Sequence, residues 1–138
     1  MPLKVALNTK LLDALRKVEG QVLDDLAPLT REQAASILEA SRLLVPVGKE
    51  DTDGRPPLNT TGFVDGPAVN SAKGSVSSTA GYDHPAAGAI HEGFHWGIKR
   101  IDKPTQFLRK PARKGRATFR KAVAARILAT LSRLFPSR

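Results

Sequence analysis

The chain has 138 residues and a net charge of +9, and it contains no cysteine. Its length corresponds to one domain, residues 1–138, and the lack of cysteine excludes disulfides, thiolate metal ligands and a thiol nucleophile. No apolar run approaches the roughly 20 residues that cross a bilayer, and no signal peptide is apparent, so we expect synthesis in the cytoplasm and no membrane partner.

Two amphipathic helices are predicted in the first third of the chain. Over residues 9–26 the apolar side chains recur at spacings of three and four and form one stripe, which comprises Leu11, Leu15, Val18, Val22 and Leu26. Pro28 should end this helix, and the capping-box pattern Thr30-Arg31-Glu32-Gln33 predicts the start of a second one. Val45-Pro46 should end the second helix, because the residue before proline disfavours the helical conformation.

A polar loop and short strands are predicted in the middle of the chain. Residues 46–62 contain three prolines and three glycines, which suits either a binding loop or a plain surface connection. The helical period then disappears. Three stretches rich in glycine and small or β-branched residues predict short strands of one antiparallel sheet, namely Gly62–Val69, Gly74–Ala80 and Ala86–Glu92.

The carboxyl end is predicted to form a docking segment and a long helix. Pro104–Leu108 reads as a short strand or a docking segment, and a helix should follow over residues 112–135. Its apolar stripe comprises Phe119, Val123, Ile127, Leu131 and Leu134. The predicted fold is therefore α+β, with two amino-terminal helices and a carboxy-terminal helix packed on a small antiparallel β-sheet.

The segment His91-Glu92-Gly93-Phe94-His95 matches the H-E-x-x-H pattern of zinc metalloproteases. In that pattern a helix places both histidines on one face, where they bind zinc while the glutamate activates water. Here glycines interrupt the segment, and the residues before it predict a strand. The remaining histidine, His84, lies upstream in a predicted turn, so a downstream third ligand is missing. We expect no metal, no cofactor and no catalytic residue.

The positive charge is concentrated at the carboxyl end. Residues 1–108 contain 12 Lys or Arg and 13 Asp or Glu, whereas residues 109–138 contain 10 Lys or Arg and no acid. Seven of these cations cluster at the start of the predicted helix: Arg109, Lys110, Arg113, Lys114, Arg116, Arg120 and Lys121. Such a cluster attracts phosphates or an acidic protein surface. A solvated helix face is the plainer interpretation.

Three short motifs, taken in order, are similar to those of one known family. Leu44-Val45-Pro46-Val47 leads out of the second helix, Tyr82–Glu92 fits the pattern Y-x-x-P-x-A-x-x-x-H-E, and Phe107-Leu108 precedes Pro111 and the last helix. Over residues 5–130 this order resembles the tail-completion proteins of tailed bacteriophages, which are also described as neck or minor tail proteins. Ala86-Ala87, Gln106 and the long proline-rich loop depart from the family pattern.

The resemblance implies a structural virion protein and no enzymatic activity. It implies a homo-oligomeric ring of six or twelve copies at the head–tail junction, which joins the connector or adaptor to the tail around the DNA channel. In the family the His-Glu pair is a structural or subunit-contact feature. The residues expected to contact other subunits are Tyr82, His91, Glu92, Trp96, Phe107 and Leu108, together with the loop over 46–62.

The basic cluster is expected to face a partner protein or packaged DNA, with which it would make non-specific contacts. The alternative function is that of a DNA-binding accessory protein that acts through this basic carboxy-terminal segment. A DNA affinity that falls steeply with salt in the monomer would favour this alternative.

Overall fold

The computed structural model describes residues 9–45, 54–92, 94–95, 99–100 and 106–137. Its main elements are helix α1 (Thr9–Arg42), strands β1 (Gly62–Asn70) and β2 (Ser75–Tyr82), and helices α2 (Ala87–His91) and α3 (Arg109–Leu134). A 3-10 turn (Leu58–Thr60) and the two-residue strands β3 (Phe94–His95) and β4 (Lys99–Arg100) are also present.

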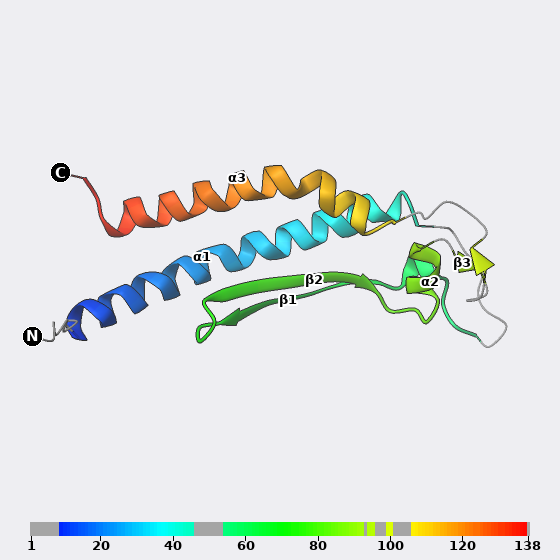
Figure 1. The fold of residues 1–138 in the computed structure, drawn as a ribbon, viewed down its shortest axis with the longest axis horizontal. Coiled ribbons are helices and arrows are strands. Elements are labelled where there is room, and N and C mark those ends of the chain that lie inside the picture. Colours follow the sequence, from blue (N-terminus) through cyan, green and yellow to red (C-terminus); the bar gives the residue numbers. More distant parts are fainter. Residues whose placement is uncertain (1–8, 46–53, 93, 96–98, 101–105, 138) are drawn as a thin grey trace, which may run out of the picture.

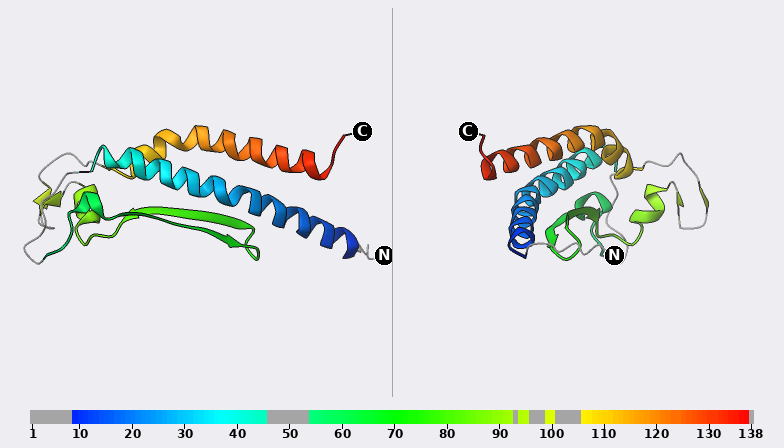
Figure 2. Two further views of the ribbon diagram at one scale, coloured as in Figure 1. Left: turned by 180° about the vertical axis from the view of Figure 1, so that it is seen from behind. Right: turned by 60° about the vertical axis from the view of Figure 1, so that its left-hand side comes forward.

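The elements form an elongated molecule of three layers, with α1 in the middle. α3 runs along one side of α1, and the β1–β2 hairpin runs along the other (Figure 1). The view from behind in Figure 2 shows the same order of layers. This arrangement confirms the predicted α+β class. Among the described helices, none combines the length and the apolar character needed to cross a membrane.

α1 is one continuous helix, although the sequence predicted two. Pro28 lies inside it, where it removes one hydrogen bond and crowds the carbonyl four residues earlier. Asp24 and Pro28 are both exposed, so water can hydrate the carbonyl that has lost its partner. Instead of capping a new helix, the Thr30 hydroxyl donates to the Ala27 carbonyl at 2.8 Å. Pro28 is therefore tolerated because it lies on the solvent side of a helix that is packed before and after it.

The buried stripe of α1 differs from the predicted one. The buried residues of this helix are Leu23, Ala27, Ala34, Leu38 and Ser41. In the predicted stripe, Val18, Val22 and Leu26 are half-buried, Leu15 is 55% exposed, and the side chain of Leu11 lies outside the described part. The start of α1 extends past the turn of the hairpin (Figure 1), so its first apolar residues have no sheet to pack against.

The β1–β2 hairpin confirms two of the three predicted strands. Its antiparallel register starts with Gly62 opposite Tyr82 and shifts once, between Asp65 and Ala68. Gly66 lies in this shift with a φ of +100°, and a Cβ there would lie 2.9 Å from a backbone oxygen of β2. Only glycine combines this backbone conformation with so close an approach of the facing strand.

The third predicted strand, Ala86–Glu92, is wrong, because Ala87–His91 form the short helix α2. Its backbone hydrogen bonds are local: the Ala87 amide donates to the His84 carbonyl and the Ile90 amide to the Ala86 carbonyl, each at 3.0 Å. The segment is rich in alanine, the best helix former. Ile90 is its one β-branched residue, so little in it favours a strand over a helical turn.

α3 begins three residues earlier than predicted and lies along α1. Pro111 falls in its first turn, where backbone amides have no acceptor within the helix, so proline costs nothing there. The predicted apolar stripe is confirmed in four of its five positions, since Phe119, Val123, Ile127 and Leu131 are half-buried. Leu134, the fifth, is 38% exposed.

The main core lies at the end of the molecule where α1 ends and α3 begins. Its buried members are Leu38, Val45, Leu58, Tyr82 and Phe107. Ser41 is fully buried, and its hydroxyl lies 2.7 Å from the Leu38 carbonyl, to which it donates, and 2.6 Å from the Tyr82 hydroxyl. Because Ser41 uses its proton on the carbonyl, Tyr82 donates to Ser41. Phe107-Leu108 form a turn, which docks Phe107 in this core before α3 starts.

A second contact between α1 and α3 centres on Asp25. The Thr130 hydroxyl donates to Asp25 Oδ2 at 2.6 Å, and the Arg133 guanidinium donates to the same oxygen at 2.9 Å. Gln21 donates to Oδ1 at 3.0 Å. The hydrogen bond from Thr130 does most to lower the pKa of Asp25 below its ordinary value of 3.8, and those from Gln21 and Arg133 add to this, against partial desolvation.

Phe107→Ala should lower the free energy of unfolding by about 3–5 kcal/mol, the usual effect of removing a fully buried aromatic ring. Phe107 is 1% exposed, so the substitution leaves a cavity against Tyr82. Urea denaturation followed by circular dichroism measures the change. Phe135→Ala is the matched control, because that ring is 65% exposed; an equal loss in both variants would contradict the core described above.

Asp25→Asn should destabilise the protein at neutral pH, with a difference from wild type that shrinks in acid. A lowered pKa contributes stability that is present above the unfolded value, 3.8, and is lost as the pH falls through the folded value. The wild type therefore loses this contribution below about pH 4, whereas the variant has none to lose. Urea denaturation over a pH series measures it, with Asp24→Asn, an exposed neighbour, as the control. A constant difference between wild type and Asp25→Asn would contradict this explanation.

Candidate functional site

The motifs singled out in the sequence meet at the junction of β2, α2 and α3. Tyr82 ends β2, His91 ends α2, and Phe107 lies in the turn before α3. The ring of Phe107 makes edge-to-face contacts with both partners: its centroid lies 5.3 Å from that of Tyr82 and 5.0 Å from that of His91, at interplanar angles of 88° and 84°. Such edge-to-face contacts are favourable, and here they join the end of β2, the end of α2 and the turn before α3.

Polar contacts around His91 reinforce this junction. His91 Nδ1 lies 3.0 Å from Glu92 Oε1, and the Arg109 guanidinium lies 3.2 Å from the same oxygen. The Arg109 amide points to His91 Nε2 at 3.4 Å, and the Gln106 amide donates to the His91 carbonyl at 3.0 Å. If Nε2 accepts from the amide, Nδ1 carries the ring proton and donates it to Glu92. His91 then contacts the start of α3 directly through Nε2, and indirectly through Nδ1, because Glu92 also contacts the Arg109 guanidinium.

The zinc interpretation of H-E-x-x-H lacks its geometry. α2 ends at His91, and His95 lies in the two-residue strand β3, so the two histidines do not share a helix face. In the described ranges no three His, Asp or Glu side chains gather as metal ligands would. The pair His91-Glu92 is engaged with α3 instead, as the preceding contacts show.

The structure separates the predicted contact residues into buried and exposed members. Tyr82 and Phe107 are 8% and 1% exposed, so they belong to the core of the chain and cannot meet a partner directly. The Glu92 side chain is 42% exposed, and Leu108 is half-buried. Trp96 and residues 46–53 of the predicted contact loop lie outside the described residues. The two buried aromatic residues therefore lie beneath the surface and stabilise it from the core.

An open apolar cavity of about 520 Å³ lies over this junction. Its lining includes Phe63, Gly81, Ala87, His91, Leu108 and Ala112. Phe63, on β1, is 41% exposed and was expected only as a strand residue. No sequence pattern predicted that Phe63 lies beside α2, because this position results from the pairing of β1 with β2.

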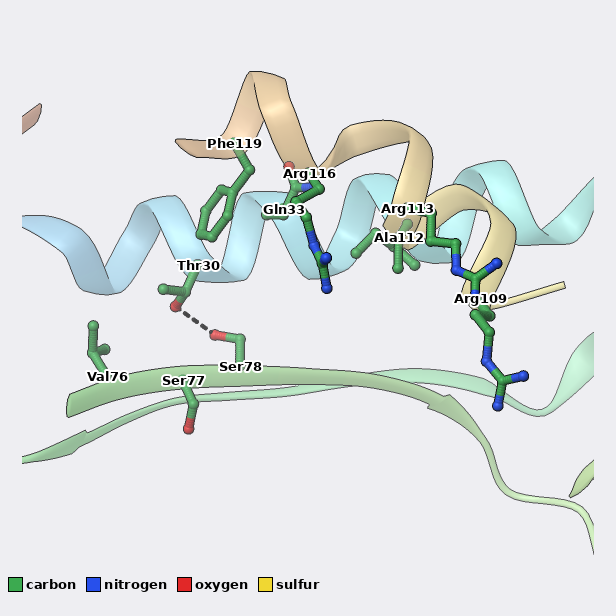
Figure 3. A pocket seen from close by; sticks show the side chains of 11 residues that line it. Thr30, Gln33, Val76, Ser77, Ser78, Arg109, Ala112, Arg113, Arg116 and Phe119 are labelled. Atoms are coloured by element: carbon green, nitrogen blue, oxygen red, sulfur yellow. Dashed lines mark hydrogen bonds between the residues drawn. The ribbon is translucent and has the colours of Figure 1, made fainter. Parts of the chain in front are cut away.

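The seven predicted basic residues are all exposed on α3, but only three of them line the same cleft. Arg109, Arg113 and Arg116 line a cleft of about 580 Å³ between α1, β2 and α3. Figure 3 shows their side chains extending from α3 toward β2. The other four are not among the residues that line this cleft: Lys110, Lys114, Arg120 and Lys121. Periodicity could have found this division, since the three arginines recur at spacings of four and three.

Comparison with known proteins gave no match to a family model, a curated protein or a solved structure.

His91→Ala should lower the free energy of unfolding by about 1–3 kcal/mol, because it leaves the Arg109 amide without its acceptor and removes the contact of His91 with Glu92. Thermal and urea denaturation measure the loss. The same measurements on the wild type with an excess of a zinc chelator should show no change, because the histidine acts through protein contacts. A chelator that reproduced the effect of the variant would restore the metal interpretation.

Proposed function

We propose that this chain is a structural subunit of the neck of a tailed bacteriophage, where copies form a ring at the head–tail junction. In this role it joins the connector to the tail around the DNA channel, catalyses nothing and takes no cofactor. The sequence resemblance suggested the family. The convergence of two of its three motifs at one junction, through Tyr82, His91 and Phe107, supports the proposal, because it gives those motifs a shared structural purpose.

The observation that carries the proposal is the elongated, layered arrangement of the described elements (Figure 1). α3 and the β1–β2 hairpin lie on opposite sides of α1. A ring subunit contacts two neighbours, and interfaces of standard size would bury about 1600 Å² of its surface in total. Two outer layers on opposite sides of the molecule offer separate surfaces for two such contacts.

Open strand edges in the hairpin also favour assembly. β1 and β2 form a two-stranded sheet, so in the described part of the chain each strand has one edge without a neighbouring strand. A neighbouring subunit can cover such an edge. Exposed apolar side chains are available on each layer for the same contacts: Leu15 on α1 is 55% exposed, Val69 on β1 is 44% exposed and Leu128 on α3 is 63% exposed.

A closed ring sets a further requirement on these surfaces. Each subunit must present two different and complementary faces, because contacts in a ring run head to tail around the axis. The layered fold provides different faces, since the outer side of the hairpin and the outer side of α3 are formed by unlike elements (Figure 2). Leu128 and Val69 lie on these two layers.

The purified chain should assemble, and Leu128→Glu should weaken the assembly. Light scattering after size-exclusion chromatography should give a mass several times the 14.8 kDa of one chain, and electron microscopy should show rings. A charge at Leu128, in the second half of α3, would have to be desolvated in the interface, which disfavours association. The variant should keep the circular dichroism spectrum of the wild type, because its side chain is exposed.

Ala129→Glu is the matched control, since it adds the same charge at the next exposed position of α3. If all three proteins had equal masses, Leu128 would not lie in the interface. A wild type that stays monomeric at every concentration would contradict self-assembly into a ring. The alternative DNA-binding accessory role would then be the better explanation of the basic segment.

A further inference from the structure

The arginine-lined cleft is a second feature of this molecule, next to the apolar junction, with which it shares Arg109 and Ala112. α1 contributes Thr30, Gln33 and Ile37, β2 contributes Val76–Ser78, and the first turns of α3 contribute the arginines. In Figure 3 the side chains of the three arginines extend from α3 toward the opening of the cleft. Its volume, about 580 Å³, exceeds that of several water molecules.

The arginines form one row on the helix. Residues at i, i+4 and i+7 share a helix face, and neighbours in such a row lie about 5–6 Å apart at Cβ. Arg109 pairs with Glu92 at 3.2 Å and is 47% exposed. For Arg113 and Arg116 the structure records no carboxylate partner within its described ranges, and none of the lining residues is acidic.

The electrostatic setting raises the positive potential of the cleft further. Arg109 lies in the first turn of α3, where the helix dipole is positive and a basic residue is unfavourable. Like charges at such spacing also repel each other. An anion bound between the arginines would relieve both effects, and a guanidinium can donate two parallel hydrogen bonds to a phosphate or a carboxylate.

The hydroxyl groups of the cleft do not compete as donors. Thr30 donates to the Ala27 carbonyl at 2.8 Å, and its oxygen lies 2.8 Å from the Ser78 hydroxyl. Since Thr30 has used its proton, Ser78 donates to Thr30. These hydroxyls connect β2 to α1, and the Ser77 side chain points from β2 away from α1 and α3 (Figure 3). The side-chain donors left for a ligand at this opening are therefore the guanidinium groups and the Gln33 amide.

We propose that this cleft binds phosphate groups of a nucleic-acid backbone, with double-stranded DNA as the ligand. The row of cations continues past the cleft to Arg120, and residues 109–138 contain no acid. A long row of positive charge matches a polymer with a regular negative charge better than it matches the isolated carboxylates of a protein surface. Ile37, Val76 and Phe119 line the cleft with apolar side chains, and contacts between the arginines and phosphates should not depend on sequence. The inference does not require the ring, because one chain supplies the whole cleft.

The test compares two double variants of the full chain that lose the same charge from the same helix. Arg113→Gln/Arg116→Gln removes the two unpaired arginines of the cleft, and Lys110→Gln/Lys114→Gln removes two exposed cations that do not line it. Fluorescence anisotropy of a short labelled duplex of mixed sequence gives the affinity between about 50 and 200 mM salt. Circular dichroism and thermal midpoints check that both variants are folded, and light scattering gives the oligomeric state of each.

The cleft variant should lose about tenfold or more in affinity at low salt, and its slope of log affinity against log salt should fall by about 2, the effect of losing two phosphate contacts. The lysine variant should lose no more than about threefold, because it changes only the general charge. Arg113→Lys/Arg116→Lys should restore part of the affinity, since it returns the charge without the paired donors.

Three results would overturn the proposal. Equal losses in the arginine and lysine variants would mean that the whole basic surface, and not the cleft, attracts DNA. If the wild type showed no salt-dependent DNA binding, DNA would not be the ligand of the cleft. Polyglutamate and unlabelled duplex can be compared as competitors at equal charge. If polyglutamate displaced the labelled duplex as effectively as the unlabelled duplex does, the ligand of the cleft would be an acidic protein instead. None of these results depends on whether the chain forms rings, which light scattering establishes separately.

Discussion

The fold depends on α1 packing against different elements on two of its faces at once. The side toward the hairpin carries Thr30 and Ser41, whose hydroxyls meet Ser78 and Tyr82 of β2. The side toward α3 carries Asp25, which accepts from Thr130. α1 is therefore the layer through which the other two are connected, and a break in it would separate them. Because the packing continues along both sides, a proline on its remaining, solvent-exposed side does not interrupt the helix.

The position of α3 follows from the core at one end of this helix. Phe107 packs against Tyr82 and His91, and the next residues turn directly into α3. Arg109 is thereby fixed beside Glu92 at 3.2 Å, and the residues one and two turns later are carried over β2. The aromatic cluster thus determines which cations face the cleft. The charged surface of α3 is thereby linked to core residues of β2 and α2.

Sequence patterns predicted much of the secondary structure but little of the site. The hairpin and the stripe of α3 could be predicted, because stretches of glycine with small or β-branched residues and a helical period are local signals. The continuity of α1 through Pro28 could not, since it depends on which face of the helix the rest of the fold covers. The helical turn at Ala87–His91 was missed, although alanine favours a helix, because five residues are too few to show a helical period. The burial of Tyr82 and Phe107 arises only from tertiary packing, and so does the position of the three arginines over β2, although their helical spacing is visible in the sequence.

The proposed assembly and the proposed cleft place opposite demands on the charge of the protein. Every copy carries a net charge of +9, so a ring would bring many like charges together and the copies would repel one another. Neighbours can pack through exposed apolar side chains such as Val69 and Leu128 only if the arginine rows point away from each other. A duplex inside the ring would offset this repulsion, because its phosphates lie at a high and regular density. The two proposals are therefore compatible in one arrangement, in which the start of α3 faces the channel and the apolar side chains face the neighbouring copies.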